Sequence, residues 1–322
     1  YMSEGEYENI RPFNPAKKGA ETDEASDTYD TAEWLVRNTD SNGCIGVTGV
    51  SYPGFYALMA ALSGHPAVKA VSPQAPVFDW YMGDDAHHNG VLMLLDTYSF
   101  GGSMYREHDN PAPKAPKSAS RIVGDAYGFF LKAGNAEGVT RTFSDSLEFW
   151  HKIMEHPDYD GFWQDRCPGR HLKDISPAVL VVGGMFDTDD CYGALKTYTA
   201  VREQSPGTDL HFVYGPWYHG GWHNTSYTHL GQVWIGEGTS GYYMEHIEYP
   251  FFRYYLEGKG EAPAAVSVLP FPAGVWENHE CWPPEGMSRR RLYLRDGDSL
   301  SFTKPSEALS FSSYVSDPQH PV

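Results

Sequence analysis

The sequence predicts an α/β fold, a mostly parallel sheet with helices on both faces, and three segments carry this prediction. An apolar run at residues 44–47 passes through a glycine-rich turn into residues 55–62, which have helical spacing. Residues 178–184 (AVLVVGG) form a continuous apolar run, typical of a strand buried in a parallel sheet. A helical pattern at 190–203 and a strand-like run at 210–214 then repeat the alternation of strand and helix.

The N-terminal elements follow from local composition. Residues 1–22 are polar and contain two prolines, so we expect a loop. Residues 27–38 (DTYDTAEWLVRN) begin with acidic side chains and carry one apolar side, which favours a helix. The next expected elements are a strand at 43–50, a helix at 54–63 and a short buried strand at 68–71.

Residues 86–175 interrupt the alternation of strand and helix. Helical spacing is found at 92–95, 126–132 and 147–154. We interpret this region as a helical cap inserted into the sheet domain, of the kind that covers an active site and shapes an acyl pocket. Periodicity alone supports equally well the alternative that these helices pack on one face of the sheet.

The C-terminal part changes character after an aromatic helix expected at 242–256. Beyond residues 258–263 the chain has short β-like runs at 265–269 and 291–294, separated by turn residues. We therefore expect two segments, 1–85 and 176–260, to form one sheet domain. Residues 264–322 would begin a separate all-β module that stops before a sandwich can close.

Composition excludes several classes of partner. The formal net charge of −18 argues against binding to nucleic acid or to an anionic membrane surface, and mildly favours neutral or cationic substrates. No apolar stretch approaches the roughly 20 residues that cross a bilayer. The four cysteines are scattered without a CxxC pair, so neither a zinc knuckle nor a disulfide framework is indicated, and we expect no cofactor.

The turn at residues 48–54 (TGVSYPG) has the strand, turn and helix context of the nucleophile elbow of an α/β-hydrolase. A side chain at Gly49 or Gly54 would collide with the neighbouring strand or block the turn. The backbone N–H of Tyr52, at the start of the helix, would point at the oxyanion formed when Ser51 attacks a carbonyl. The alternative is an ordinary turn serine, and the second glycine lies three rather than two residues after it.

A serine nucleophile needs a base and an acid that orients the base. In this fold they follow the serine in the order acid, then histidine, on loops at strand ends. Asp187 follows the strand at 178–184, and His219 follows the strand at 210–214. The sequence therefore predicts a triad of Ser51, Asp187 and His219. His223 is the rival base, and Asp189 or Asp190 the rival acid.

Only 50 residues precede Ser51, whereas an α/β-hydrolase places several strands before its elbow. We therefore expect that an N-terminal part of the fold is missing from this sequence, and that targeting cannot be read from it.

Four motifs together resemble the cocaine esterase and X-Pro dipeptidyl-peptidase group of α/β-hydrolases. They are GVTGVSYPGF around the serine, GDD at 83–85, FDTDD at 186–190 and GPWYHGG at 215–221. Within the group the chain is most similar to the α-amino acid ester hydrolases. The resemblance implies the same triad, Tyr52 N–H as one oxyanion donor, a C-terminal jelly roll, and a periplasmic or secreted location. It places the second oxyanion donor, a tyrosine hydroxyl, upstream of this sequence.

The same resemblance implies a cluster of three carboxylates, Asp85, Asp189 and Asp190, that binds the substrate α-ammonium. Charge-assisted hydrogen bonds to an ammonium would offset the cost of burying these acids. Asp189 stands where the family usually has glutamate. As an alternative, Asp189 and Asp190 lie at a helix N-terminus, where acids are favoured without any ligand.

The function expected is hydrolysis of α-amino acid esters and amides through an acyl-enzyme, with acyl transfer to β-lactam amines as an extension. An X-Pro dipeptidyl peptidase and a general carboxylesterase are the alternatives on the same scaffold. A metal-dependent hydrolase would instead use four neighbouring side chains together with His219 and His223, namely Asp84, Asp85, His87 and His88. A non-catalytic binding protein is the remaining alternative, and the sequence leaves a homo-oligomer open.

Overall fold

The computed structural model describes residues 8–103, 122, 124–143, 147–307, 309–317 and 319–320. Its centre is a six-stranded sheet in the order β1-β2-β5-β6-β9-β10, parallel throughout except for the last pair. The strands are β1 (Ile45–Ser51), β2 (Val68–Pro76), β5 (Ala178–Gly184), β6 (Leu210–Gly215), β9 (Val266–Val268) and β10 (Glu277–His279). The predicted α/β fold is confirmed.

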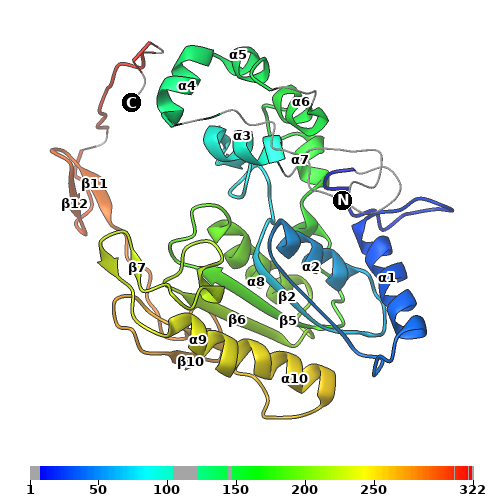
Figure 1. The fold of residues 1–322 in the computed structure, drawn as a ribbon. Helices are drawn as coiled ribbons and strands as arrows, with labels where there is room; N and C mark the ends of the chain where they lie inside the picture. Colours follow the sequence, from blue (N-terminus) through cyan, green and yellow to red (C-terminus); the bar gives the residue numbers. More distant parts are fainter. Residues whose placement is uncertain are drawn as a thin grey trace.

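Helices cover both faces of this sheet (Figure 1). One face carries α1 (Glu24–Asn38), α2 (Tyr52–Leu62) and α8 (Cys191–Gln204). The other carries α9 (Thr239–Tyr243), the π-helical turn η3 (Met244–Glu248) and α10 (Tyr249–Glu257). In β5, Val181 packs with the first group of helices and Leu180 with the second, which is why this strand is apolar at successive positions.

The region between β2 and β5 is mainly helical. It contains the hairpin β3 (His87–His88) and β4 (Val91–Leu92), then α3 (Leu94–Ser103), α4 (Ala126–Ala133), α5 (Ala136–Thr140), α6 (Glu148–Glu155), α7 (Gly161–Asp165) and the 3-10 turn η1 (Pro168–Arg170). Tyr98, Val139, Leu147 and Trp150 form a buried cluster separate from those on the sheet. The helix expected from residue 92 begins only at Leu94, because the hairpin occupies the preceding residues.

One expectation for the C-terminal part is wrong. The strand expected at 265–269, as part of a separate β module, is β9, and it joins the central sheet beside β6. Val266 and Val268 are buried there, paired with Phe212 and Tyr214, and a run this short does not reveal from sequence which sheet it joins. The later run forms the hairpin β11 (Tyr293–Arg295) and β12 (Ser299–Ser301), while the rest of the module stays a prediction.

Three short elements complete the described chain: the 3-10 turn η2 (Gly221–His223) and the hairpin of β7 (His229–Leu230) and β8 (Val233–Trp234). Within the described ranges, no helix has the length and apolar character needed to span a membrane.

The start of α8 lies against the end of β2 because residue 193 is a glycine. A Cβ atom on Gly193 would lie 1.8 Å from the carbonyl oxygen of Pro76 and 3.0 Å from Oδ1 of Asp84. Backbone cannot yield as a flexible side chain does, so this close approach depends on glycine.

We predict that Gly193→Ala lowers the free energy of unfolding by about 1–3 kcal/mol through overpacking. Urea denaturation should show this loss as a lower midpoint at unchanged slope. Gly161→Ala is the matched control, since Gly161 is also in a helix and a Cβ there meets nothing within 4 Å. Equal midpoints for the two variants would contradict the prediction.

Candidate active site

Ser51 occupies a strained turn between β1 and α2. Its φ is +69° and its ψ is −128°, a conformation that non-glycine residues rarely adopt outside functional sites. A Cβ on Gly49 would lie 2.3 Å from the carbonyl oxygen of Pro53, and one on Gly54 would lie 2.7 Å from that of Gln74. The expected collisions at both glycines are confirmed. Tyr52 is the first residue of α2, where backbone N–H groups lack partners within the helix.

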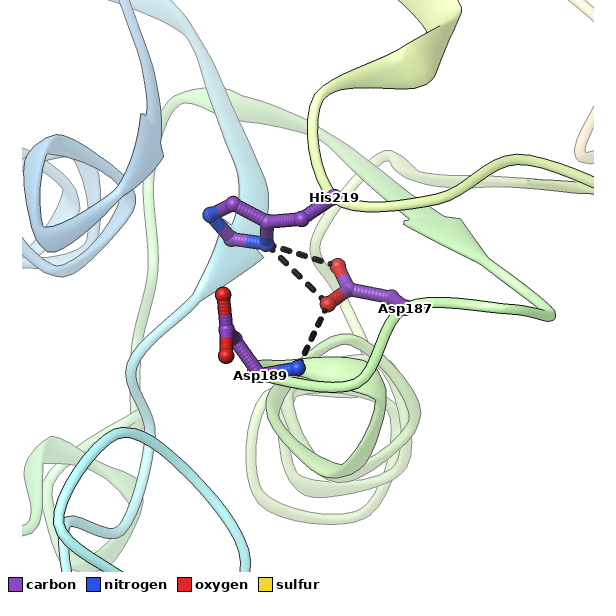
Figure 2. Close-up of side chains that lie close together, drawn as sticks. All are labelled: Asp187, Asp189 and His219. Atoms are coloured by element: carbon purple, nitrogen blue, oxygen red, sulfur yellow. Dashed lines mark hydrogen bonds and ion pairs between the residues drawn. The ribbon is translucent and has the colours of Figure 1, made fainter. Parts of the chain in front are cut away.

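Asp187 and His219 come together from the loops that follow two adjacent strands, β5 and β6 (Figure 2). His219 Nδ1–H donates to Asp187 Oδ2 at 2.9 Å and lies 3.1 Å from Oδ1. The Asp187 side chain is wholly buried. Its Oδ1 also accepts the backbone N–H groups of Asp189 and Asp190, at 2.9 and 3.0 Å. This carboxylate is therefore fixed in place and fixes the imidazole.

The imidazole of His219 is held in a negative environment. Burial alone would lower its pKa, but the hydrogen bond and charge of Asp187, with the charges of Asp189 and Asp85, raise the pKa above its ordinary value. The loop after His219 packs close to the nucleophile strand, since a Cβ on Gly220 would lie 3.9 Å from Cγ1 of Val50.

In the described part of the chain Ser51 Oγ and His219 share no hydrogen bond. Such bonds often tighten only when substrate binds. The rival base His223 is engaged elsewhere, because its Nε2 lies 3.0 Å from Oε2 of Glu248.

Asp190 is completely buried, and neither of its carboxylate oxygens has a hydrogen-bond partner among the described residues. Burial raises its pKa well above the ordinary range, and the charges of Asp85 and Asp84 add to the effect. Asp190 is the N-cap residue of α8, yet its side chain makes no capping bond. Helix capping therefore does not explain this acid. Its Oδ2 lies 4.0 Å from His219 Nε2, which places it beside the candidate base.

The other two acids of the expected cluster lie around Asp190. Asp189 is partly buried, with its carboxylate turned toward the His219 ring (Figure 2), and burial raises its pKa while the charge of His219 opposes the rise. Asp85 is 5% exposed and has a positive φ of 32°, in the left-handed region that is costly for a non-glycine residue. Besides burial, the charges of Asp85 and Asp189 both raise the pKa of Asp190, so the structure places these three carboxylates near one another.

Asp84 has a structural position next to this cluster. Its Oδ2 accepts the backbone N–H groups of Phe78 and Asp79, at 3.0 and 2.9 Å, and its Oδ1 accepts that of Gly193 at 2.8 Å. These bonds join the turn after β2 to the start of α8. Asp84 thereby holds its neighbour Asp85 close to Asp190.

The side chains considered from the sequence as metal ligands do not form the expected site. His87 lies in an aromatic cluster, with ring centroids 4.6 Å from Tyr81 and 5.2 Å from Trp163, and burial lowers its pKa to about 4. Within the described residues, the group with spacing suited to a metal ion is Asp187, Asp189 and His219, with ligand atoms within 4.8 Å of one another. Two of these three side chains are the acid and base of the predicted triad.

Sequence reasoning did not single out Gln74, Trp222 and Glu248, which are joined by hydrogen bonds close to His219 in the chain, Trp222 being part of the turn η2 that follows it. Trp222 Nε1–H donates to Gln74 Oε1 at 2.7 Å, and Gln74 Nε2–H donates to Glu248 Oε1 at 2.6 Å. The available signal was a glutamine inside the buried run of β2, and it gave no indication of its distant partners.

Comparison with known proteins supports this architecture. Residues 1–221 match the family model described as X-Pro dipeptidyl-peptidase (S15 family). The cocaine esterase of Rhodococcus sp. (strain MB1 Bresler) is 26% identical over 325 residues, which cover 93% of this chain and 54% of the esterase.

Two solved structures resemble the chain across almost its whole length. An aminopeptidase from a marine sediment archaeon, Thaumarchaeota archaeon, superposes with a TM-score of 0.86 at 33% identity, and an α-amino acid ester hydrolase with 0.86 at 31%. Each comparison covers 98% of this chain and 52% of the other, so the chain spans about half the length of these relatives. The family model covers more than half of the chain, and the chain therefore belongs to the X-Pro dipeptidyl-peptidase (S15) family.

Proposed function

We propose that this protein is a serine hydrolase that acts on α-amino acid esters and amides through Ser51, His219 and Asp187. The observation that carries the proposal is the buried Asp190 carboxylate, which has no hydrogen-bond partner in the described chain and lies 4.0 Å from His219. Buried acids without hydrogen-bond partners are costly and cluster at functional sites. A cationic group on the substrate would supply the missing partner.

In the proposed reaction His219 Nε2 accepts the proton of Ser51, whose Oγ attacks the carbonyl carbon of the ester or amide. Asp187 accepts the Nδ1–H bond and stabilises the imidazolium that forms. The N–H of Tyr52 stabilises the developing oxyanion. His219 then donates its proton to the leaving alcohol or amine. Water, activated by the same imidazole, hydrolyses the acyl-enzyme and restores Ser51.

The substrate ammonium would lie among Asp85, Asp189 and Asp190. Each N–H···carboxylate bond is charge-assisted, and together these bonds offset the free-energy cost of removing the ammonium and the carboxylates from water. Because the acids surround His219, an ammonium held there places the adjacent carbonyl near Ser51. The amine would thus serve both affinity and orientation.

The packing of the helices between β2 and β5 supports the interpretation of this region as a cap over the site. Phe149, Ile153 and Trp163 pack in one cluster with Tyr52 and Phe55 of the elbow helix. We infer that residues 86–175 act as a cap that shapes the acyl pocket, and that residues after β10 begin a jelly roll, as the family resemblance implies.

An X-Pro dipeptidyl peptidase is the second candidate, favoured by the family match and by the likeness to an aminopeptidase. The N-terminal ammonium of a peptide would suit the same three carboxylates. Acyl transfer to a β-lactam amine is a further extension, in which an amine replaces water. Turnover of an X-Pro anilide, of phenylglycine methyl ester, and of that ester with a β-lactam nucleus as acceptor separates the three.

We predict that Ser51→Ala lowers kcat on phenylglycine methyl ester by at least about 10³-fold, because the acyl-enzyme cannot form. The wild-type protein should be labelled by a fluorophosphonate and the variant should not, with mass spectrometry as the measurement. Insensitivity of wild-type turnover to a chelator checks the metal-dependent alternative. Full activity in the variant would refute the serine mechanism.

Asp190→Asn should reduce kcat/KM on phenylglycine methyl ester by roughly 10–100-fold, since a charged hydrogen bond is worth about 1.5–3 kcal/mol. Phenylacetic acid methyl ester lacks the α-amine and is the matched control substrate. Its kcat/KM should change less than about threefold. Equal losses on both esters would assign Asp190 to structure rather than to amine binding.

The same variant should be more stable than the wild type at neutral pH. The folded-state pKa of Asp190 lies above its ordinary value of 3.8. The stability that the protonated Asp190 carboxyl contributes to the folded state is therefore complete below about pH 4. That contribution is lost as the pH rises through the folded-state pKa. Urea unfolding of Asp190→Asn should show a gain of about 1–3 kcal/mol at pH 8 and little at pH 4. A constant difference across this range would contradict the assignment.

A further inference from the structure

A buried polar network lies between the nucleophile strand and the loop that carries His219. Gln74 is its centre: the residue is completely buried in β2 and is the register partner of Val50, next to Ser51. Trp222 N–H can only donate, and it binds Gln74 Oε1 at 2.7 Å. The Glu248 carboxylate accepts from Gln74 Nε2 at 2.6 Å. These two partners fix the orientation of the amide.

Hydrogen bonds of this network hold the loop that follows His219. Trp222 follows His219 by three residues, and the intervening Gly220 has a φ of +71°. Ser240 Oγ–H donates to the carbonyl of Gly221 at 2.9 Å, and His223 Nε2 lies 3.0 Å from Glu248 Oε2. Three consecutive residues, 221–223, are thus held by hydrogen bonds. Gln74 links this network to the strands beside Ser51, since its Nε2 also lies 3.2 Å from Oγ1 of Thr48 on β1 and 3.1 Å from Oγ of Ser72 on β2.

The π-helical turn η3 brings the acidic partner into reach. Tyr243 and Glu248 are five residues apart, and the tyrosine hydroxyl donates to Glu248 Oε1 at 3.1 Å. The same hydroxyl lies 3.1 Å from Gln74 Nε2. π-Helical turns are rare and are found mainly at functional sites. In this protein the wider turn lets the side chains of Tyr243 and Glu248 both hydrogen-bond the Gln74 amide.

We propose that Gln74 and Glu248 are positioning residues that set the distance between His219 and Ser51. Their side chains form no hydrogen bond with Ser51 or His219 in the described chain, and they act through Trp222 and His223. This inference rests on the proposed serine hydrolase function. It adds two residues, 174 positions apart in the chain, to the determinants of the reaction rate.

The test exchanges the two side chains in the full chain. Gln74→Leu removes both central bonds, and Gln74→Glu sets two carboxylates against each other, which cannot both ionise at this distance. Each should lower kcat on phenylglycine methyl ester by roughly 10–100-fold with KM changed less than about threefold, as expected for a misplaced base. The double variant Gln74→Glu/Glu248→Gln restores one amide facing one carboxylate. It should recover kcat to within about fivefold of the wild type.

Tyr255→Phe is the matched control, because Tyr255 OH bonds His211 at 2.9 Å at the far end of β6 and its loss should leave kcat unchanged. Rates are expressed per folded molecule, measured by near-UV circular dichroism. Unchanged kcat in Gln74→Leu, or no recovery in the double variant, would overturn the proposal. Absence of Ser51-dependent turnover in the wild type would instead overturn the proposed function. The imidazole NMR resonances of His219 in Gln74→Leu would then still report whether the loop moves.

Discussion

The hydrogen-bonded carboxylate of Asp187 is the interaction on which the site depends. It accepts the imidazole N–H of His219 and the backbone N–H groups of Asp189 and Asp190. One buried group therefore places both the candidate base and the residues that lead into α8, Asp189 and Asp190, two of the three acids proposed to bind an ammonium. The parallel order of β5 and β6 brings the two loops to the same edge of the sheet, so the fold supplies the proximity and Asp187 supplies the alignment.

Asp84 and Asp190 are both buried acids, and they differ in the donors that the protein gives them. Asp84 is surrounded by three backbone N–H donors and serves to join the turn after β2 to α8. Asp190 is equally buried and receives no such donor in the described chain. A carboxylate satisfied by the protein stabilises the fold, whereas one left without donors is a cost that the folded state bears until a cation arrives. This contrast distinguishes the structural acid, Asp84, from Asp190, the acid proposed to bind a cation.

Local sequence signals predicted the elements whose causes are local. The elbow was visible because Gly49 and Gly54 are required by backbone contacts, and β5 was visible because both of its faces are covered. The strand β9 was assigned to the wrong sheet, since three residues carry no information about their lateral neighbour. The contact between Gln74 and Glu248 spans 174 positions and depends on a π-helical turn, a feature with no sequence periodicity of its own. Long-range polar pairing was therefore beyond prediction from a single sequence.

Gln74 faces the elbow and the histidine loop at once. Its backbone carbonyl limits residue 54 to glycine, while its side chain holds Trp222. One strand, β2, thus sets the spacing between the nucleophile and the base. For enzyme engineering this divides the molecule into a part to leave untouched and a part to vary. Substrate range should be altered through the helices between β2 and β5, which we propose as the cap, because changes in β2 would disturb the nucleophile and the base together.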